Sequence, residues 1–563
     1  MIEKVYELIC KTEDANIIST EEIVGKSFLK NYKHVISVET ELSLNEGLKI
    51  IQLYIAFKEP YSVYLPKIYI DEKSYEDIRY IPHVNRDLSI CIIEESDGFY
   101  FDIEDLPQIV VELIAKAKTI LRGIDDEEYL NKEFEREFQA YWNIKYCSKD
   151  KPQEIGLCLV DFQNIQNLKA IKFVDKFGFY KYLIYTESDE FNLFKDYLKF
   201  RNIKYVEIQV FLTEYDKLKP PYDTTLRSSL DYLKHNTDFK HRINKLRSDD
   251  FIIVFKNNNH DEFFGWSYPL INERTKGFRP VSNWQFLNSK LSERYFIERI
   301  SFANISPKRL DVRTSGIEIS RDLKVAVIGL GSVGSNLLHY LAKYPISEYC
   351  LVDPDILKVE NVFRNKFGFN YLNYNKIDIA KNEILSKNPF TKVTNHKKSI
   401  IDILNENPLF LEQYDCRFII LGISRIEKFI LKHLININSS KPLILIWVEP
   451  YLASGQLVYL KPEDFKKGID LLNNYPYHVL NKNQKLSMKE GSCQTGYMPY
   501  SDLNLSLFLS NINMILYNFM IEKNVTVSKV FSWIGNIERL IEQGFEIELN
   551  YENKKFTIIE NEF

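Results

Sequence analysis

The spacing of apolar residues divides the chain into three kinds of segment. Near the N-terminus, the runs LKIIQLYIAF and SVYLPKIYI alternate as antiparallel strands do, and a helical stripe follows at 104–122. Between about 146 and 300, strand-like runs such as YVEIQVFL and FIIVFKNNN mix with helical runs such as FNLFKDYLKF. From Val325, the continuous apolar run VAVIGL is typical of a buried strand, and an amphipathic helix follows it. The pattern predicts an α/β multidomain protein.

The strand at Val325 leads into a turn with the spacing G-x-G-x-x-G. Its glycines are Gly329, Gly331 and Gly334, and the second strand, YCLVDPD, ends at Asp353. Glycines at these positions let the backbone approach a phosphate at the positive N-terminus of the helix. The Asp353 carboxylate can accept hydrogen bonds from ribose hydroxyls. The combination predicts a nucleotide site, and a tight turn without a ligand is the alternative.

The residues after Asp353 favour ATP over NAD. The polar and charged positions that follow it in order are Asp355, Asn361, Arg364 and Lys376. This order resembles the ubiquitin-activating and sulfur-carrier-adenylating (ThiF-like) family, which has D-x-D, N-x-x-R-Q and G-x-x-K-A there, with Asn365 replacing the Gln here. The resemblance implies that these residues bind ATP, accompanied by Mg²⁺. The two cations would then stabilise phosphate charge when a carboxylate attacks the α-phosphorus. The alternative is that both are surface cations.

The same resemblance bears on a metal ligand and a thiol. The family's second Asp in D-x-T-D-N, which helps to hold Mg²⁺, falls on Ser424, so no metal ligand is assigned. The family's activating cysteine lies in a crossover region, which places it at Cys493 in the polar run KEGSCQTGYMPYS. Cys350 and Cys416 lie in or beside apolar strands and are expected in the core. The seven cysteines include no C-x-x-C pair, which disfavours a structural zinc site and a disulfide framework.

The N-terminal segment resembles the ubiquitin-conjugating family in the run IPHVNRDLSIC. The family pattern H-P-N-x-N-x-x-G-x-I-C is matched at Pro82, Asn85, Ile90 and Cys91. The resemblance implies that Cys91 carries an acyl thioester, whereas its apolar neighbours would also suit a buried structural cysteine. The family's oxyanion-stabilising Asn falls on His83, whose ring N–H can also donate to an oxyanion; alternatively, His83 only braces the loop. Leu88 stands where Gly is usual.

Composition limits the partners. Apolar residues make up 45% of the chain, charged residues make up 27%, and the net charge is −5, so bulk charge attracts neither nucleic acid nor a membrane. The sequence has no run of eighteen apolar residues, and its N-terminus lacks the apolar core of a signal peptide. We therefore expect a cytoplasmic protein without nucleic-acid or membrane partners, and the cysteine usage fits a reducing compartment.

Three domains are expected: a ubiquitin-conjugating-like α+β domain at 1–145, a small α/β linker domain at 146–300, and a Rossmann-like, ThiF-like adenylation domain at 301–563 that includes the crossover loop. Fusion in this order resembles the bacterial proteins of cyclic-oligonucleotide anti-phage systems (CBASS). The resemblance implies a relay in which a protein C-terminus is adenylated, passes to Cys493 and then Cys91, and is joined to an amine. It also implies that the donor is a cGAS-like synthase primed for defence, and that the enzyme is a homodimer.

Other functions remain open. The chain could conjugate a separate ubiquitin-like protein by the same chemistry. A sulfur-carrier adenylyltransferase is disfavoured by the extra conjugating-like segment, and a nucleotide-binding adaptor is disfavoured by the two thiols. An NAD oxidoreductase is disfavoured by Arg364 and Lys376. The sequence identifies neither the acyl donor nor the acceptor, which could be a lysine of a protein or a small amine.

Overall fold

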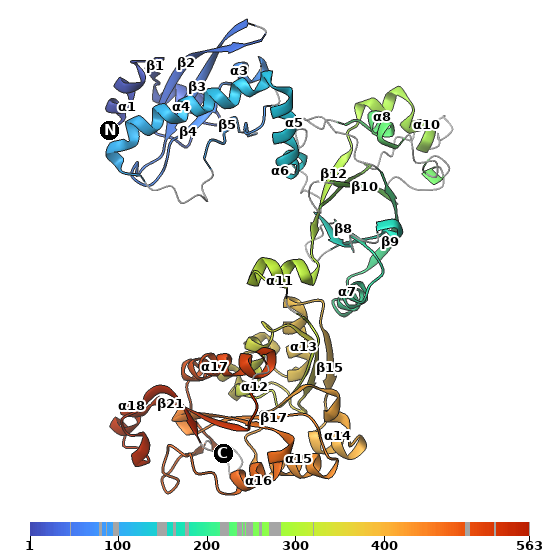
Figure 1. Cartoon of the computed structure of the whole chain (residues 1–563), viewed down its shortest axis with the longest axis vertical. Helices are drawn as coiled ribbons and strands as arrows, with labels where there is room; N and C mark the ends of the chain where they lie inside the picture. Colours follow the sequence, from blue (N-terminus) through green and yellow to red (C-terminus); the bar gives the residue numbers. More distant parts are fainter. Residues whose placement is uncertain are drawn as a thin grey trace. The chain divides into compact units, whose positions relative to one another are not determined.

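The computed structural model describes residues 1–45, 47–77, 81–85, 87–93, 101–143, 155–160, 165–174, 180–213, 224–233, 239, 242–243, 251–257, 262–268, 283–318, 320–489, 496–522, 525–561 and 563. These residues form two compact units (Figure 1). The first unit contains Met1–Thr186 and Tyr205–Asn304, and the second contains Glu187–Lys204 and Ile305–Phe563. Both units mix helices and strands, which confirms the expected α/β multidomain class.

An antiparallel sheet crossed by one long helix forms the N-terminal part of the first unit. The sheet follows chain order, with strands β1 (Asp14–Ile17), β2 (His34–Leu44), β3 (Gly47–Phe57), β4 (Lys67–Ile70) and β5 (Ser89–Ile90). Helices α1 (Ile2–Ile9) and α4 (Leu106–Arg122) bury apolar stripes in one core with the sheet, and α2 (Thr20–Gly25) and α3 (Glu72–Asp77) are short. The expected strand in SVYLPKIYI is confined to β4, because Pro66 cannot donate to a ladder.

The middle of the chain closes into a barrel. Its described strands are β6 (Ile155–Leu159), β7 (Lys169–Val174), β8 (Tyr180–Tyr185), β9 (Tyr205–Leu212), β10 (Phe251–Asn257), β11 (Glu262–Ser267) and β12 (Glu298–Asn304). They pair in the order β10-β11-β12-β6-β8-β7-β9, and β9 returns to pair with β10. The strand and helix pattern did predict the elements, but it did not predict closure, which depends on pairing between distant strands.

Two helices join the N-terminal part to this barrel. Helices α5 (Glu127–Arg136) and α6 (Phe138–Asn143) contribute Phe138 and Trp142 to an aromatic core that also contains barrel side chains. The Phe138 ring lies 4.7 Å from that of Phe264, and the Trp142 indole N–H donates to the Ile300 carbonyl at 3.0 Å. Short helices α8 (Leu226–Ser229) and α10 (Asn283–Leu287) accompany the barrel.

One helix encoded between two barrel strands belongs to the second unit. Helix α7 (Asp189–Phe200) follows β8, and its Phe194 ring stacks on Phe390 at 6.0 Å. Just past its end, the Arg201 guanidinium donates to the Asn382 side chain at 2.7 Å. The Asn382 side chain lies on α13 (Lys376–Lys387), so the middle segment of the chain also supplies part of the second unit's packing.

The second unit is built on a mixed sheet with the order β15-β14-β13-β16-β17-β18-β21-β22. The first five strands in this order are parallel: β13 (Leu323–Ile328), β14 (Ile346–Val352), β15 (Lys392–His396), β16 (Cys416–Ile419) and β17 (Leu443–Val448). Three antiparallel strands extend it: β18 (Ser454–Leu460), β21 (Lys529–Asn536) and β22 (Lys555–Asn561). The carboxyl ends of the parallel strands meet at one edge, where such sheets bind ligands.

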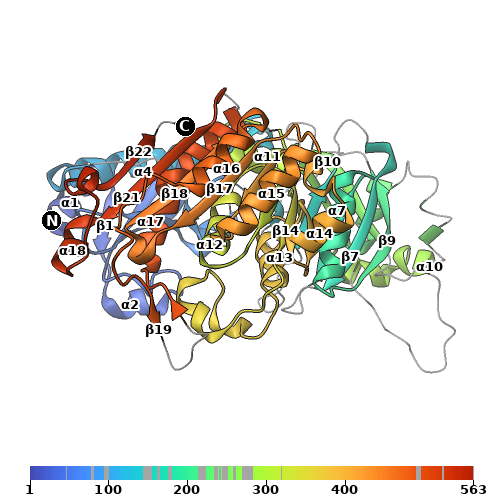
Figure 2. The same ribbon diagram turned by 90° about the horizontal axis from the view of Figure 1, so that it is seen from below.

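Helices cover both faces of this sheet. One core contains α12 (Ser332–Leu341), α13 and α17 (Asp502–Tyr517). The other contains α14 (Ile400–Glu406), α15 (Ser424–Asn436) and α16 (Phe465–Asn473), and α15 and α16 lie along strands β17 and β18 in Figure 2. The remaining helices are α11 (Pro307–Ser315) and α18 (Ile537–Glu542). Covering on both faces explains why the parallel strands are continuous apolar runs.

Candidate functional site

The glycine turn lies between the end of β13 and the start of α12. Gly329 has a φ of +96°, and a Cβ there would lie 2.6 Å from the Ile420 carbonyl oxygen. A Cβ on Gly334 would lie 2.0 Å from the Gly329 carbonyl oxygen, so the helix packs directly on the turn. Gly331 caps α12, and a Cβ on it would meet nothing within 4 Å. The N-terminus of α12 therefore faces open space, as phosphate binding requires.

Asp353 follows β14 and is buried, with 6% of its surface exposed. Its carboxylate accepts hydrogen bonds from the Leu330 N–H at 2.6 Å and from the Asp355 N–H at 2.8 Å. Burial raises the pKa of this carboxyl, while the nearby Lys376 and the two N–H donors oppose the rise. Asp353 thus stabilises the glycine turn, and its remaining lone pairs could accept hydrogen bonds from ribose hydroxyls.

The two expected cations lie near this turn in different settings. Lys376 begins α13, is only 5% exposed, and pairs through Nζ with Asp355 at 3.1 Å. The Arg364 guanidinium donates to the Met498 carbonyl at 3.4 Å and lies over the Tyr500 ring at 5.6 Å. The Arg364 Nε is buried without a hydrogen-bond partner among the described residues. A buried N–H donor of this kind is available to form a hydrogen bond with a ligand.

Amide side chains hold the Arg364 segment against the turn. Asn361 lies in the short 3-10 helix Val359–Arg364, and its carbonyl accepts the Asn365 N–H at 2.8 Å. The Asn365 side chain donates to the Leu330 carbonyl at 3.3 Å, and Asn336 on α12 donates to the Arg364 carbonyl at 3.1 Å. Asn365, which replaces the family's Gln, therefore keeps a contact with the turn. Asn336 was not expected from the sequence, since its spacing marks only a helix face.

The edge beyond β16 differs from the family pattern. Ser424 is exposed at the first position of α15, and its hydroxyl donates to the Leu472 carbonyl at 3.5 Å. The part of the chain that is described contains no group of three or more His, Cys, Asp or Glu residues that could hold a metal ion. Glu427 was not predicted from the sequence; it is 3% exposed, and burial raises its pKa to about 7.

Cys493 lies outside the described residues, but described residues before and after 490–495 form hydrogen bonds at the sheet edge. Glu449 follows β17 and accepts the N–H groups of Val479 and Leu480 at 3.1 and 3.2 Å. On the other side, the Tyr451 N–H donates to the Pro499 carbonyl at 2.7 Å. Together with the contact from Arg364 to Met498, these bonds hold the flanks of the loop beside the edge that carries the glycine turn.

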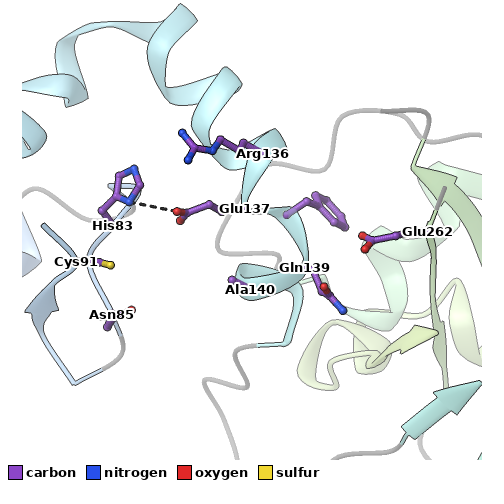
Figure 3. A pocket seen from close by; sticks show the side chains of 9 residues that line it. His83, Asn85, Cys91, Arg136, Glu137, Gln139, Ala140 and Glu262 are labelled. Atoms are coloured by element: carbon purple, nitrogen blue, oxygen red, sulfur yellow. Dashed lines mark ion pairs between the residues drawn. The ribbon is translucent and has the colours of Figure 1, made fainter. Parts of the chain in front are cut away.

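Cys91 lies in a separate pocket in the first unit (Figure 3). The pocket measures about 400 Å³. Its lining residues are His83, Asn85, Cys91, Arg136, Glu137, Phe138, Gln139, Ala140 and Glu262. Cys91 follows β5, is exposed, and donates its N–H to the His83 carbonyl at 2.7 Å. The structure thus brings Cys91, His83 and Asn85 together, as the loop sequence predicted, and adds side chains from α5, α6 and β11.

The imidazole of His83 lies between two carboxylates. Nε2 is 3.2 Å from Glu133 Oε2. Nδ1 is 3.2 Å from Glu137 Oε1, and a dashed line marks this ion pair in Figure 3. Its backbone has a φ of +67°, a region in which Asn and His are among the favoured non-glycine residues, and its N–H donates to the Tyr141 hydroxyl at 2.6 Å. Leu88 has a φ of +69°, which explains why Gly is usual there.

The expected core cysteines are buried. Cys350 and Cys416 lie within the second unit's sheet, and burial raises the pKa of Cys350 to about 11. Cys158 in β6 is also buried, and its pKa rises to about 12 for the same reason. Thiols in such settings remain protonated and are poor nucleophiles.

Solved structures to which part of the chain aligns include PaaA, at 16% identity, and E. coli MccB with succinimide, at 15% identity. Each has a TM-score of 0.29 and covers 43% of this chain and 64% of the other protein. E. coli MccB with ATP aligns at 17% identity and a TM-score of 0.27, over 40% of this chain and 63% of that one. The chain thus spans less than two thirds of these proteins. A comparison with curated proteins gives no match.

Two family models match separate parts of the chain. Residues 21–150 match prokaryotic E2 family B, which covers the Cys91 loop together with α4, α5 and α6. Residues 306–473 match the ThiF family, which covers the glycine turn and the cations that follow it. Among the helices that the structure describes, none is both long and apolar enough to cross a membrane. The chain therefore joins an N-terminal segment that matches an E2 family model to a C-terminal segment that matches the ThiF family model.

Proposed function

We propose that this protein activates the C-terminus of another protein with ATP and transfers it through two cysteines to an amine. The observation that carries the proposal is the ThiF-matching edge, where an open helix N-terminus, Lys376 and Arg364 lie around one turn. Fixed positive charge is what a carboxylate needs to attack an α-phosphorus while pyrophosphate leaves. A hydride-transfer site has no such need for charge.

The residues at the turn suit ATP as a substrate. The phosphates would lie at the N-terminus of α12, the ribose would meet Asp353, and Arg364 Nε is a buried donor without a described partner. Lys376 would exchange its partner Asp355 for a phosphate oxygen. Mg²⁺ bound with a nucleotide keeps several waters and one or two carboxylates, and Asp355, with 66% of its side chain exposed, would be the carboxylate to hold it.

The E2-like match supports a second acyl carrier in the proposal. Cys91 is exposed in a pocket, which a thioester carrier requires, and Cys493 is our candidate for the first thiol. Adenylation gives the acyl group a good leaving group, and each thioester keeps most of that reactivity. Fusing both carriers in one chain raises the effective concentration of the second thiol around the first. His83 would support the final aminolysis at Cys91.

We further propose that the donor is the tail of a cGAS-like cyclic-nucleotide synthase and that the enzyme works as a cytoplasmic homodimer in anti-phage defence. The fusion order supports this, because a single chain that holds both carriers serves one dedicated donor. The acceptor would be a protein lysine or a small amine. Incubation with ATP and such a synthase, followed by mass spectrometry, should find isopeptide bonds from its C-terminus; conjugation of a separate ubiquitin-like protein instead would refute this donor.

Adenylation itself is tested by ATP–pyrophosphate exchange. Lys376→Met should reduce exchange by at least about 10²-fold, because a buried cation at the phosphates is lost. Lys392→Met is the matched control, since Lys392 begins β15 at the opposite edge of the sheet. Full exchange in Lys376→Met would refute the assignment.

The order of the thiols is tested by trapping. Cys91→Ala should accumulate a reductant-sensitive thioester on Cys493. Cys493→Ala should still exchange pyrophosphate but load neither thiol. A donor thioester on Cys91 in the Cys493→Ala protein would reverse the order.

A further inference from the structure

Two acidic side chains and an arginine from outside the active-site loop line the Cys91 pocket. Among the described residues that line it, Glu137 and Glu262 are acidic and Arg136 is basic. Figure 3 shows Glu137 reaching from the end of α5 toward His83, on the same side of the loop as the Cys91 sulfur. An acidic pocket favours a positively charged ligand, so an acceptor amine would enter it as an ammonium ion.

The two carboxylates that hold His83 are not equivalent. Glu133 is the more enclosed, with 13% of its side chain exposed; it also lies 3.7 Å from Arg136 and is absent from the pocket lining. Glu137 has 29% of its side chain exposed and lines the pocket. Glu133 therefore anchors the ring through Nε2, while the contact between Nδ1 and Glu137 is at the surface that a substrate reaches.

This arrangement leaves the ring no spare N–H. An imidazole donates through both nitrogens only when it is protonated, and here each nitrogen already faces a carboxylate. A donor to an oxyanion would have to give up one of these contacts. With both nitrogens against carboxylates, the ring also has no free nitrogen to accept a proton, so its role is to orient the carboxylates. The Glu137 carboxylate, which lines the pocket, is the group that can accept a proton there.

We propose that Glu137 is the general base that binds the acceptor ammonium and deprotonates it at the Cys91 thioester, with His83 and Glu133 as positioning residues. The inference rests on the proposed thioester at Cys91 and goes beyond it by naming the base. Glu137 is the catalytic residue that touches the acceptor, and His83 holds the Glu137 carboxylate through Nδ1.

The proposed step balances without any further reactant. The acceptor enters as R–NH₃⁺, and the Glu137 carboxylate takes one proton, which leaves to water. The nitrogen lone pair forms a C–N bond to the thioester carbonyl carbon. The C–S bond then breaks with its electron pair on the Cys91 sulfur, and Glu137 moves a second proton from nitrogen to that sulfur. The products are an amide and the Cys91 thiol.

The test bypasses ATP, so that its failure is distinct from failure of adenylation. The full-length protein is acylated with a synthetic peptide that ends in a glycine thioester of mercaptoethanesulfonate, and Cys91→Ala identifies the modified site. After removal of excess peptide, discharge is followed by intact-protein mass spectrometry with lysine or with hydroxylamine. Lysine must lose a proton before it attacks, whereas hydroxylamine is already neutral at pH 7.

Glu137→Gln should slow discharge to lysine by about 10²-fold, as expected for loss of a general base, and leave discharge to hydroxylamine nearly unchanged. Glu137→Asp should recover most of the rate with lysine. His83→Asn removes the ring that holds the Glu137 carboxylate, so it should also slow discharge to lysine more than discharge to hydroxylamine. Glu128→Gln, on an exposed part of the same helix, is the matched control.

Three outcomes would overturn the proposal. Equal losses toward both nucleophiles in Glu137→Gln would make Glu137 structural. A fully active His83→Asn would make His83 an oxyanion donor. Failure of the thioester peptide to acylate Cys91 in the wild-type protein would refute both Glu137 as the base and the relay. Absent pyrophosphate exchange together with normal discharge would refute adenylation alone.

Discussion

Glu427 gives the second unit a stability that falls as the pH rises. Its carboxyl is 3% exposed, and Oε1 has no hydrogen-bond partner among the described residues. Burial raises the pKa of Glu427 from 4.5 to about 7, although the N–H groups of Ile423 and Gly422 favour the charged form. The folded protein therefore keeps a proton at pH 6 that the unfolded chain has released.

The sign and size of the effect follow from linkage. Below pH 4.5 both states are protonated, and Glu427 contributes no pH dependence. Between pH 4.5 and about 7 the folded state binds more protons than the unfolded state, so the free energy of unfolding decreases as the pH rises. The gap between the two pKa values corresponds to roughly 3 kcal/mol of unfolding free energy, and this contribution is lost by the time the pH exceeds 7. Glu427→Gln has the same shape without the charge and should remove this loss.

The assay is hydrogen exchange with mass spectrometry between pH 5 and pH 8, following peptides of α15 and β16 in the full-length protein after correction for the intrinsic exchange rate. The free energy of opening in Glu427→Gln, relative to wild type, should rise by roughly 2 to 3 kcal/mol across this range, since part of the loss already occurs below pH 5. Glu383→Gln, an exposed glutamate on α13, is the control. A constant offset between Glu427→Gln and wild type at every pH would refute the reasoning, since it would mean that Glu427 does not titrate differently in the folded state.

Three further predictions concern packing and reactivity. Gly334→Ala should weaken ATP binding at least about tenfold by titration calorimetry, because its Cβ would lie 2.0 Å from a turn carbonyl; Gly368→Ala, with its nearest atom at 3.8 Å, should not. Iodoacetamide at pH 8 should label Cys91 and spare Cys350, whose pKa is about 11, as read by peptide mapping. Trp142→Ala should destabilise the first unit by about 3–5 kcal/mol in urea unfolding.

The nucleotide edge could be predicted from sequence because its signal is local. A strand, a glycine turn, a helix and a second strand occupy consecutive residues, and each leaves its own periodicity. The contacts of the expected residues were less predictable. Arg364 lies against Met498 and Tyr500, more than a hundred residues away, and Asp353 is bonded to the turn's own N–H groups. No periodicity encodes contacts between segments so far apart.

The Cys91 pocket likewise combines a local feature that could be predicted with distant contacts that could not. The loop that presents Cys91 and His83 was predicted from one run of eleven residues. The carboxylates that hold His83 were not, because Glu133 and Glu137 lie about fifty residues later on a helix whose polar residues could equally face solvent. The burial of Glu427 could not be predicted for a related reason. A glutamate in an amphipathic helix is normally exposed, and only the folded structure shows that this one is buried.

The position of α5 and α6 links the proposed acceptor chemistry to the barrel. Phe138 lines the Cys91 pocket and also belongs to the aromatic core that α6 shares with the barrel. Glu137 precedes Phe138 in the chain. The packing that positions the Phe138 ring therefore also positions the Glu137 carboxylate. Rotating α6 by a fraction of a turn would move Glu137 away from His83 and open the pocket wall. The barrel therefore determines the geometry of the pocket, and substitutions in its aromatic core should alter aminolysis at Cys91 before they alter acylation of the exposed thiol.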